Sequence, residues 1–391
     1  MRKVLVYSLL LIFGLIGSQT FATNAPPAVH RAIALATMFA LSFIMIHVGY
    51  EFEMDKSRPR SYAWDYLVAS SAAALPWIFC TLYFVFAMAP RSAWGSSKLW
   101  ENSLLEGLFA APTSAGVLFS MLAAAGLGAT WLFKKARVLA IFDDLQTVLL
   151  LIPMKIFLIG PRWQLFAIAA VIFGLLIIAY RYLNAWALPN SWPWVMLYAA
   201  LIVAGSELIH WLSVQFDPTV PIHLEVLLPA FAVGCVIKPP HGQDPHVDDA
   251  LEGTEEGPEM HEEQLVSTIV SAVFMILVGL SMPPILSREM TVGWGMIVLH
   301  VLAITIISNL GKMFPAVCYR AEAGWRERLA LAIGMFPRGE VGAGVLVIAL
   351  SYDLAGPSIT VAVLSLVLNL MCTGLFIVIV KRLIRAPAVA G

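Results

Sequence analysis

Long apolar runs, separated by short polar segments, repeat along almost the whole 391-residue chain. Most runs reach about 20 residues, the length that an α-helix needs to cross the hydrocarbon core of a bilayer. The pattern therefore predicts an all-α polytopic membrane protein with 11–12 transmembrane helices. The spans expected after the N-terminal segment are 30–50, 66–89, 103–127, 137–160, 163–183, 193–215, 219–238, 264–286, 292–319, 327–352 and 357–380.

The N-terminal segment, residues 1–22, has two interpretations. A basic start, an apolar run and a small residue at Ala22 are typical of a cleaved signal peptide. The same apolar run, from about residue 4 to residue 22, is also long enough to be a retained first transmembrane helix. The sequence leaves both interpretations open.

One long polar segment, residues 239–263, divides the remaining spans into an N-terminal half, 28–238, and a C-terminal half, 264–385. The segment is acidic and contains three histidines. We expect a flexible cytoplasmic linker, and a sensor of pH or metal ions built from those histidines is the less favoured alternative.

Composition and charge agree with a membrane protein. The chain is 60% hydrophobic and 13% charged, whereas soluble domains are about 25% charged. Sixteen of the 24 Lys and Arg residues fall in loops on one side of the predicted membrane and five on the other. The positive-inside rule makes the first side cytoplasmic. No basic tract suggests nucleic acid, and the four cysteines lie in apolar spans without metal-ligand spacing.

Two adjacent carboxylates, Asp143 and Asp144, interrupt the apolar run 137–160. One ionised Asp deep in hydrocarbon costs ~2.5–3.5 kcal/mol, so such residues usually mark an ion or proton pathway. Lys312, in the span 292–319, lies at a similar depth of ~10 Å below the same membrane face. We expect the buried lysine to pair with the acids. Snorkelling of its ammonium to the cytosol is the less favoured alternative.

Two further spans carry a proline near the middle. Pro112 lies in the segment APTSAGVL and Pro337 in the segment GMFPRGEVG. A proline within a span frees a backbone carbonyl, and neighbouring glycines allow local unwinding. One such break in each half, in spans of opposite direction, is typical of an inverted-repeat transporter. Arg338 and Glu340 are then expected to neutralise each other and the half-helix ends.

Five segments together resemble the monovalent cation:proton antiporter family, which includes the Kef-type and bacterial Na+/H+ exchangers. They are HVGYEFEMD, APTSAGVL, FDDLQT, SNLGKMFPA and GMFPRGEVG, which follow the order and spacing of that family over residues 42–350. The resemblance implies an inverted-repeat antiporter fold with two crossed broken helices. The N-terminal region is shorter than in many members of the family. A C-terminal nucleotide-binding regulatory domain is not expected, which argues against a ligand-gated potassium efflux system.

The resemblance also implies roles for individual residues. Asp144 is expected to be the principal carrier of cation and proton, and Asp143 to pair with Lys312. Thr113 and Ser114 are expected to lend oxygens to the cation where the broken helices cross. Paired aspartates in this family usually accompany electrogenic exchange.

The function expected from these features is monovalent cation:proton antiport by alternating access, with Na+ favoured over K+. The chain is not expected to be an enzyme or to hold a cofactor, and the transported Na+, Li+ or K+ and H+ are its substrates. A homodimer in the bacterial inner membrane is implied by the resemblance. Two alternatives are a Na+-coupled organic-anion symporter of similar fold and a membrane sensor that transports nothing.

Overall fold

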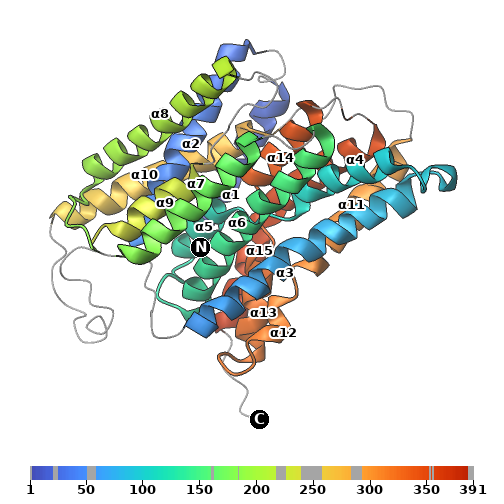
Figure 1. Cartoon of the computed structure of the whole chain (residues 1–391). Helices are drawn as coiled ribbons and strands as arrows, with labels where there is room; N and C mark the ends of the chain where they lie inside the picture. Colours follow the sequence, from blue (N-terminus) through green and yellow to red (C-terminus); the bar gives the residue numbers. More distant parts are fainter. Residues whose placement is uncertain are drawn as a thin grey trace. The chain divides into compact units, whose positions relative to one another are not determined.

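The computed structural model describes residues 2–20, 25–50, 59–159, 163–183, 185–216, 226–238, 258–282, 293–351, 354 and 356–385. Within these ranges the regular structure is helical, apart from one isolated bridge between Trp186 and Ile237 (Figure 1).

Helices form at all the predicted spans. Their bounds are α1 (Arg2–Thr20), α2 (Pro27–Tyr50), α3 (Pro59–Tyr83), α4 (Ser97–Gly107), α5 (Ala115–Ala124), α6 (Trp131–Ile159), α7 (Trp163–Arg181), α8 (Trp192–Phe216), α9 (Leu227–Val236), α10 (Pro258–Leu280), α11 (Trp294–Gly311), α12 (Pro315–Cys318), α13 (Trp325–Gly334), α14 (Glu340–Ser351) and α15 (Pro357–Arg385). A π-helical turn, Phe84–Met88, continues α3, and a 3-10 turn, Leu108–Ala110, continues α4.

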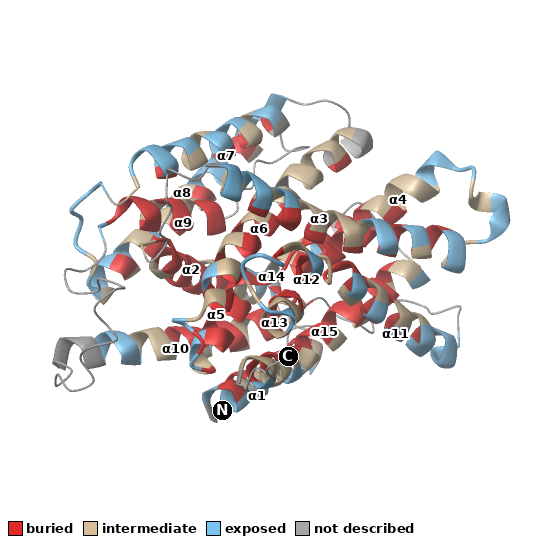
Figure 2. Cartoon of the chain, turned by 90° about the horizontal axis from the view of Figure 1, so that it is seen from below, coloured by how far each residue is buried: buried red, intermediate tan, exposed pale blue. Residues whose placement is uncertain are grey.

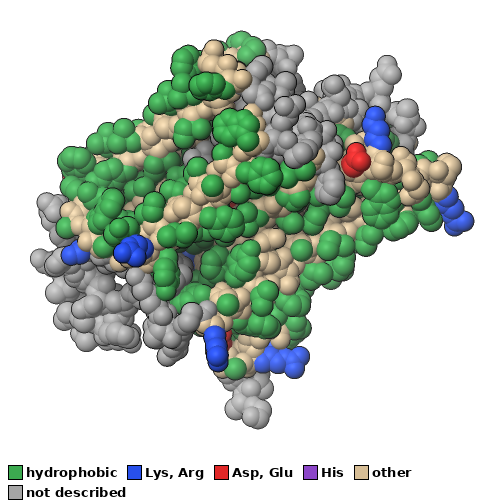
Figure 3. Space-filling view, in the orientation of Figure 1, with side chains coloured by type: hydrophobic (Ala, Val, Ile, Leu, Met, Phe, Trp, Pro, Cys, Tyr) green, Lys and Arg blue, Asp and Glu red, His purple; other side chains and the backbone are tan. Residues whose placement is uncertain are grey.

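The chain is a multi-pass membrane protein. In the part of the chain that the structure describes, eight segments are long and apolar enough to cross a membrane. On the face drawn in Figure 3, hydrophobic side chains predominate, and the Lys and Arg side chains lie near its edges. The expected fold class is confirmed.

Helix boundaries beside the expected linker differ from the predicted spans. Helix α10 begins at Pro258, so the last six residues of the expected linker 239–263 are helical. Proline suits the first position of a helix, and the acidic residues that follow it complement the helix dipole. Helix α9 begins at Leu227 rather than at residue 219. Residues 217–225 and 239–257 lie outside the described part of the chain.

The chain forms two compact units, which do not follow the division into halves at the linker. The first unit comprises Met1–His30, Ser57–Gly160 and Met275–Gly391. The second comprises Arg31–Lys56 and Pro161–Phe274. Within the second unit, α9 packs against α7 and α8. All seven candidate site residues belong to the first unit.

Helices α3 and α15 organise the first unit. Helix α3 packs against α6, α4 and α11, and α15 packs against α1, α11 and α13. A side chain at Gly311 of α11 would place its Cβ 2.6 Å from the backbone nitrogen of Pro76 in α3, so glycine allows these helices their close approach. Most of α5 and the second half of α13 are buried (Figure 2).

Helix α1 is packed closely inside the first unit. A Cβ at Gly14 would lie 2.1 Å from the carbonyl oxygen of Ile276, and one at Gly279 would lie 2.3 Å from that of Leu11. Facing glycines thus bring α1 against the end of α10. The interpretation of residues 2–20 as a helix of the folded protein therefore has a packing basis, whereas Ala22 lies outside the described residues.

We predict that Gly14→Ala lowers the melting temperature of the detergent-purified protein. The added methyl group must push α1 away from α10, and overpacking of this kind costs ~1–3 kcal/mol. Gly174→Ala in α7 is the matched control, because nothing lies within 4 Å of its added Cβ. Thermal unfolding of both variants checks the prediction, and equal melting temperatures would contradict the packing of α1.

Candidate functional site

The first break lies between α4 and α5. The helix continues as the turn Leu108–Ala110 and then stops, because Pro112 has no N–H to donate to a carbonyl one turn earlier and its ring clashes with that carbonyl. Helix α5 begins at Ala115, and the Ser114 hydroxyl oxygen caps it by accepting a hydrogen bond from the Val117 N–H (3.4 Å). The carbonyl groups just before the proline are left without helical partners.

The second break, between α13 and α14, lies against the first. The Ser114 N–H donates to the Pro337 carbonyl (2.9 Å), and the Thr113 hydroxyl donates to the Met335 carbonyl (3.0 Å). A Cβ at Gly339 would lie 2.8 Å from the Ser114 hydroxyl oxygen, so glycine is required for this approach. The two broken helices therefore cross at their breaks, as the fold class predicts.

The predicted span 292–319 implied that Lys312 lies within one continuous helix. The structure shows instead that the helix is interrupted at this residue. Helix α11 ends at Gly311, Lys312 follows as its C-cap, and α12 begins at Pro315. The proline ring would clash with the carbonyl of Gly311 four residues earlier, which explains why the helix ends there. The lysine therefore leaves α11 at a turn beside the crossing.

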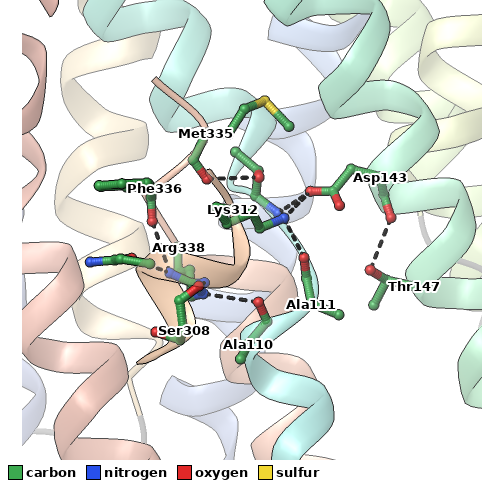
Figure 4. A network of polar contacts seen from close by, with 11 residues as sticks. Ala110, Ala111, Asp143, Thr147, Ser308, Lys312, Met335, Phe336 and Arg338 are labelled. Atoms are coloured by element: carbon green, nitrogen blue, oxygen red, sulfur yellow. Dashed lines mark hydrogen bonds and ion pairs between the residues drawn. The ribbon is translucent and has the colours of Figure 1, made fainter. Parts of the chain in front are cut away.

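The Lys312 side chain is fully buried, with 0% exposure. Its ammonium donates to Asp143 Oδ2 (2.7 Å) and to the Ala111 carbonyl of the first break (Figure 4). The same carboxylate oxygen accepts a hydrogen bond from the Thr113 N–H (2.8 Å). One ion pair thus joins the end of α11, the first break and α6.

Asp144 lies next to this pair in α6. Its side chain is 2% exposed and interacts electrostatically with Lys312. Together with Arg338, the site holds two acidic and two basic side chains, all of them buried. Their formal charges balance when all four are ionised.

Arg338 binds the breaks through backbone carbonyls. Its Nε donates to Ala110 (3.1 Å), Nη1 to Phe336 (3.1 Å) and Nη2 to Ser308 (3.1 Å), while Nη1 also donates to Asn309 Oδ1 (2.9 Å). Three of these partners, Ala110, Phe336 and Ser308, are labelled in Figure 4. The expected partner Glu340 has a side chain outside the described part, so that pairing stays a prediction.

The hydroxyls of Thr113 and Ser114 have structural partners in this conformation. The Thr113 hydroxyl donates to the Met335 carbonyl of the second break, and the Ser114 hydroxyl caps α5. Each hydroxyl oxygen has two lone pairs, so these bonds leave acceptor capacity. Their role as cation ligands stays a prediction.

A second ion cluster, only partly buried, escaped the sequence analysis. Lys135, in the first turns of α6, contacts both oxygens of Asp65 in α3 (3.1 and 3.3 Å) and the Glu322 carboxylate (2.9 Å). The Tyr319 hydroxyl donates to the same Asp65 (2.7 Å). Burial, and then the neighbouring Asp65, raise the pKa of Tyr319, so this hydroxyl stays protonated. No sequence spacing joins these residues, which come from three separate segments.

The crossed breaks with a buried lysine–aspartate pair define the fold class of a membrane antiporter. The fold is similar to that of the sodium proton antiporter MjNhaP1 from Methanocaldococcus jannaschii at pH 8, with a TM-score of 0.56 and 15% sequence identity. The likeness covers 96% of this chain and 90% of that chain. A comparison with curated proteins gives no match.

The family model described as "Sodium/hydrogen exchanger, transmembrane" matches residues 2–383. The chain belongs to this family of membrane transporters. The resemblance to monovalent cation:proton antiporters is therefore confirmed, and so is cation:proton antiport as its class of function.

We predict that Thr113→Val weakens the crossing and Thr113→Ser preserves it. Valine keeps the shape of threonine but leaves the buried Met335 carbonyl without its hydroxyl donor, at a cost of ~1–3 kcal/mol. The melting temperature should fall for the valine variant and stay near the wild-type value for the serine variant. A valine variant as stable as the serine variant would show that this hydrogen bond does not hold the breaks together.

Proposed function

We propose that the chain exchanges Na+ for H+ at a site formed by Asp143 and Asp144, with Lys312 as a second proton carrier. The observation that carries the proposal is the fully buried contact between the Lys312 ammonium and Asp143 Oδ2 at the crossing of the two breaks. The lysine ammonium occupies the Asp143 carboxylate, so a transported cation must compete with it for that carboxylate.

The competition follows from the ligands of Asp143. Its Oδ2 serves the lysine and the Thr113 N–H, whereas Oδ1 has no hydrogen-bond partner within the described residues. Hard cations take oxygen ligands, and two neighbouring carboxylates provide them. A Na+ ion bound between the carboxylates of Asp143 and Asp144 repels the ammonium, and this repulsion favours release of the lysine proton.

Charge counting then gives the stoichiometry. With Na+ bound and Lys312 neutral, the two aspartates balance Na+ and Arg338. With Na+ gone, Lys312 and Asp144 each take a proton, and the site carries one positive charge. One Na+ thus exchanges for two H+, and one net charge crosses per cycle. The membrane potential contributes ~2.3 kcal/mol per charge per 100 mV to such a cycle.

An empty site cannot complete the cycle alone. With Lys312 neutral and no Na+ bound, both aspartates are ionised and neither has Na+ or the ammonium in contact. An ionised carboxylate without such a partner is costly in the apolar core. In the proton-loaded site Asp143 is paired with the ammonium and Asp144 is neutral, so this cost ties movement of the site to occupation by either Na+ or protons.

The setting of the protein is also part of the proposal. We infer that α1 is retained as the first transmembrane helix, since facing glycines bind it to α10 and the family match begins at residue 2. The resemblance supports a homodimer in a bacterial inner membrane, with residues 239–263 linking the halves on the cytoplasmic side. Na+ is preferred over Li+ and K+ as the cation to test first.

We predict that Asp144→Asn abolishes Na+-driven proton movement in everted membrane vesicles while the protein still inserts. An amide cannot carry the proton and supplies no negative charge to Na+. Glu101→Gln, at the half-buried outer end of α4, is the matched acid-to-amide control and should exchange normally. Internal pH after a Na+ pulse checks both variants, and wild-type exchange by Asp144→Asn would remove this residue from the scheme.

We predict that the double variant Lys312→Gln/Asp143→Asn makes exchange electroneutral. Without the lysine only Asp144 exchanges a proton for Na+, so no net charge moves. Initial rates in proteoliposomes should respond to an imposed potential in the wild type and not in the double variant. The single variant Lys312→Gln should be less stable than the double, because loss of one partner of a buried pair costs ~3–5 kcal/mol. A double variant that still responds to potential would contradict the lysine's role.

A further inference from the structure

Asn369, in the middle of α15, is a buried amide without a role in the site described above. Its side chain is 0% exposed. Within the described residues, neither its Oδ1 acceptor nor its Nδ2 donor has a hydrogen-bond partner. An unsatisfied buried polar group is costly, so a native structure rarely keeps one without a bound molecule.

Neighbours along α15 show which way this amide faces. Ser365, one turn earlier, shares a hydrogen bond with the Thr305 hydroxyl of α11 (2.9 Å). Phe376, two turns later, packs its ring edge-on against Phe336 in the second break, with centroids 5.4 Å apart. Residues spaced by four and seven lie on one helix face. Asn369 therefore lies on the face of α15 that meets α11 and the second break.

The segments opposite that face are those that bind Arg338. The guanidinium accepts no hydrogen bonds, and it holds the carbonyls of Phe336 and Ser308, which come from the second break and from α11. Ser308 follows Thr305 by one turn and is 0% exposed. The amide thus adjoins a polar part of an otherwise apolar core.

We propose that Asn369 binds an internal water molecule between α15, α11 and the second break. Water is the small ligand that both accepts from Nδ2 and donates to Oδ1, and buried waters typically serve such orphan groups. A cation would contact Oδ1 alone and leave the donor unpaired, and it would lie on the side of the core where Arg338 is held. This assignment does not depend on the exchange mechanism proposed above.

A bound water would also let the second break shift without losing its hydrogen bonds. Its hydrogen bonds rearrange at small cost when an adjoining carbonyl shifts, whereas a packed leucine allows no such adjustment. Asn369 then acts as a positioning residue for the segment that carries Arg338.

Radiolytic hydroxyl labelling of the full-length protein in detergent, read by mass spectrometry, tests the proposal. Radicals formed from a bound water label the side chains nearest to it, so the α15 segment around Asn369, residue 369 itself excluded, should be labelled in the wild type. In Asn369→Leu this labelling should fall at least threefold. Asn369→Ser keeps a donor and an acceptor and should retain the label. Asn102→Leu, in α4, is the matched control and should leave it unchanged.

A density map of the wild type that resolves ordered water gives the second readout. We expect a peak about 3 Å from the Asn369 amide, the length of a hydrogen bond to water. Equal labelling in the wild type and Asn369→Leu, or a resolved map without that peak, would overturn the assignment. Neither readout measures transport, so failure of the water site and failure of the exchange proposal are distinguishable.

Discussion

A buried ammonium group needs partners, and this need determines the arrangement around the crossing. Lys312 finds a carboxylate in Asp143 and a backbone carbonyl at Ala111. That carbonyl is available only because Pro112 ends the helix before it can be used internally. The lysine and the broken helix therefore require each other: an intact helix would offer no acceptor, and an unpaired break would leave buried carbonyls unsatisfied.

Arg338 repeats the same arrangement one residue earlier, at the carbonyl of Ala110. Two cations thus meet the carboxyl end of one half-helix, where the helix dipole is negative. Helix α3 sets the distance between the elements involved. It holds α6 through the contacts of Asp65 with Lys135, and it meets α11 where Gly311 lies against Pro76. The geometry of the ion pair depends on this third helix as well as on the residues that form the pair.

The sequence was sufficient to predict most of the fold, because length and hydropathy mark each span and a proline marks each break. The matched depth of Lys312 and the Asp143–Asp144 doublet was also sufficient to predict a pairing, and the resemblance to the antiporter family implied that Asp143 is the partner. The end of α11 at Gly311 was missed, although Pro315 indicates it. The partners of Arg338 could not be predicted, since backbone carbonyls leave no side-chain pattern in a sequence. The same holds for the cluster around Asp65, whose members come from distant segments.

Three contacts at the crossing share one chemical property. The bonds from Ser114 to Pro337, from Thr113 to Met335 and from Arg338 to Ala110 all end on a main-chain oxygen. A main-chain oxygen survives any substitution of its own residue. These hydrogen bonds can therefore persist when the residues that supply the acceptors are substituted. This durability offers a physical reason why a chain with 15% identity to MjNhaP1 still has a similar fold.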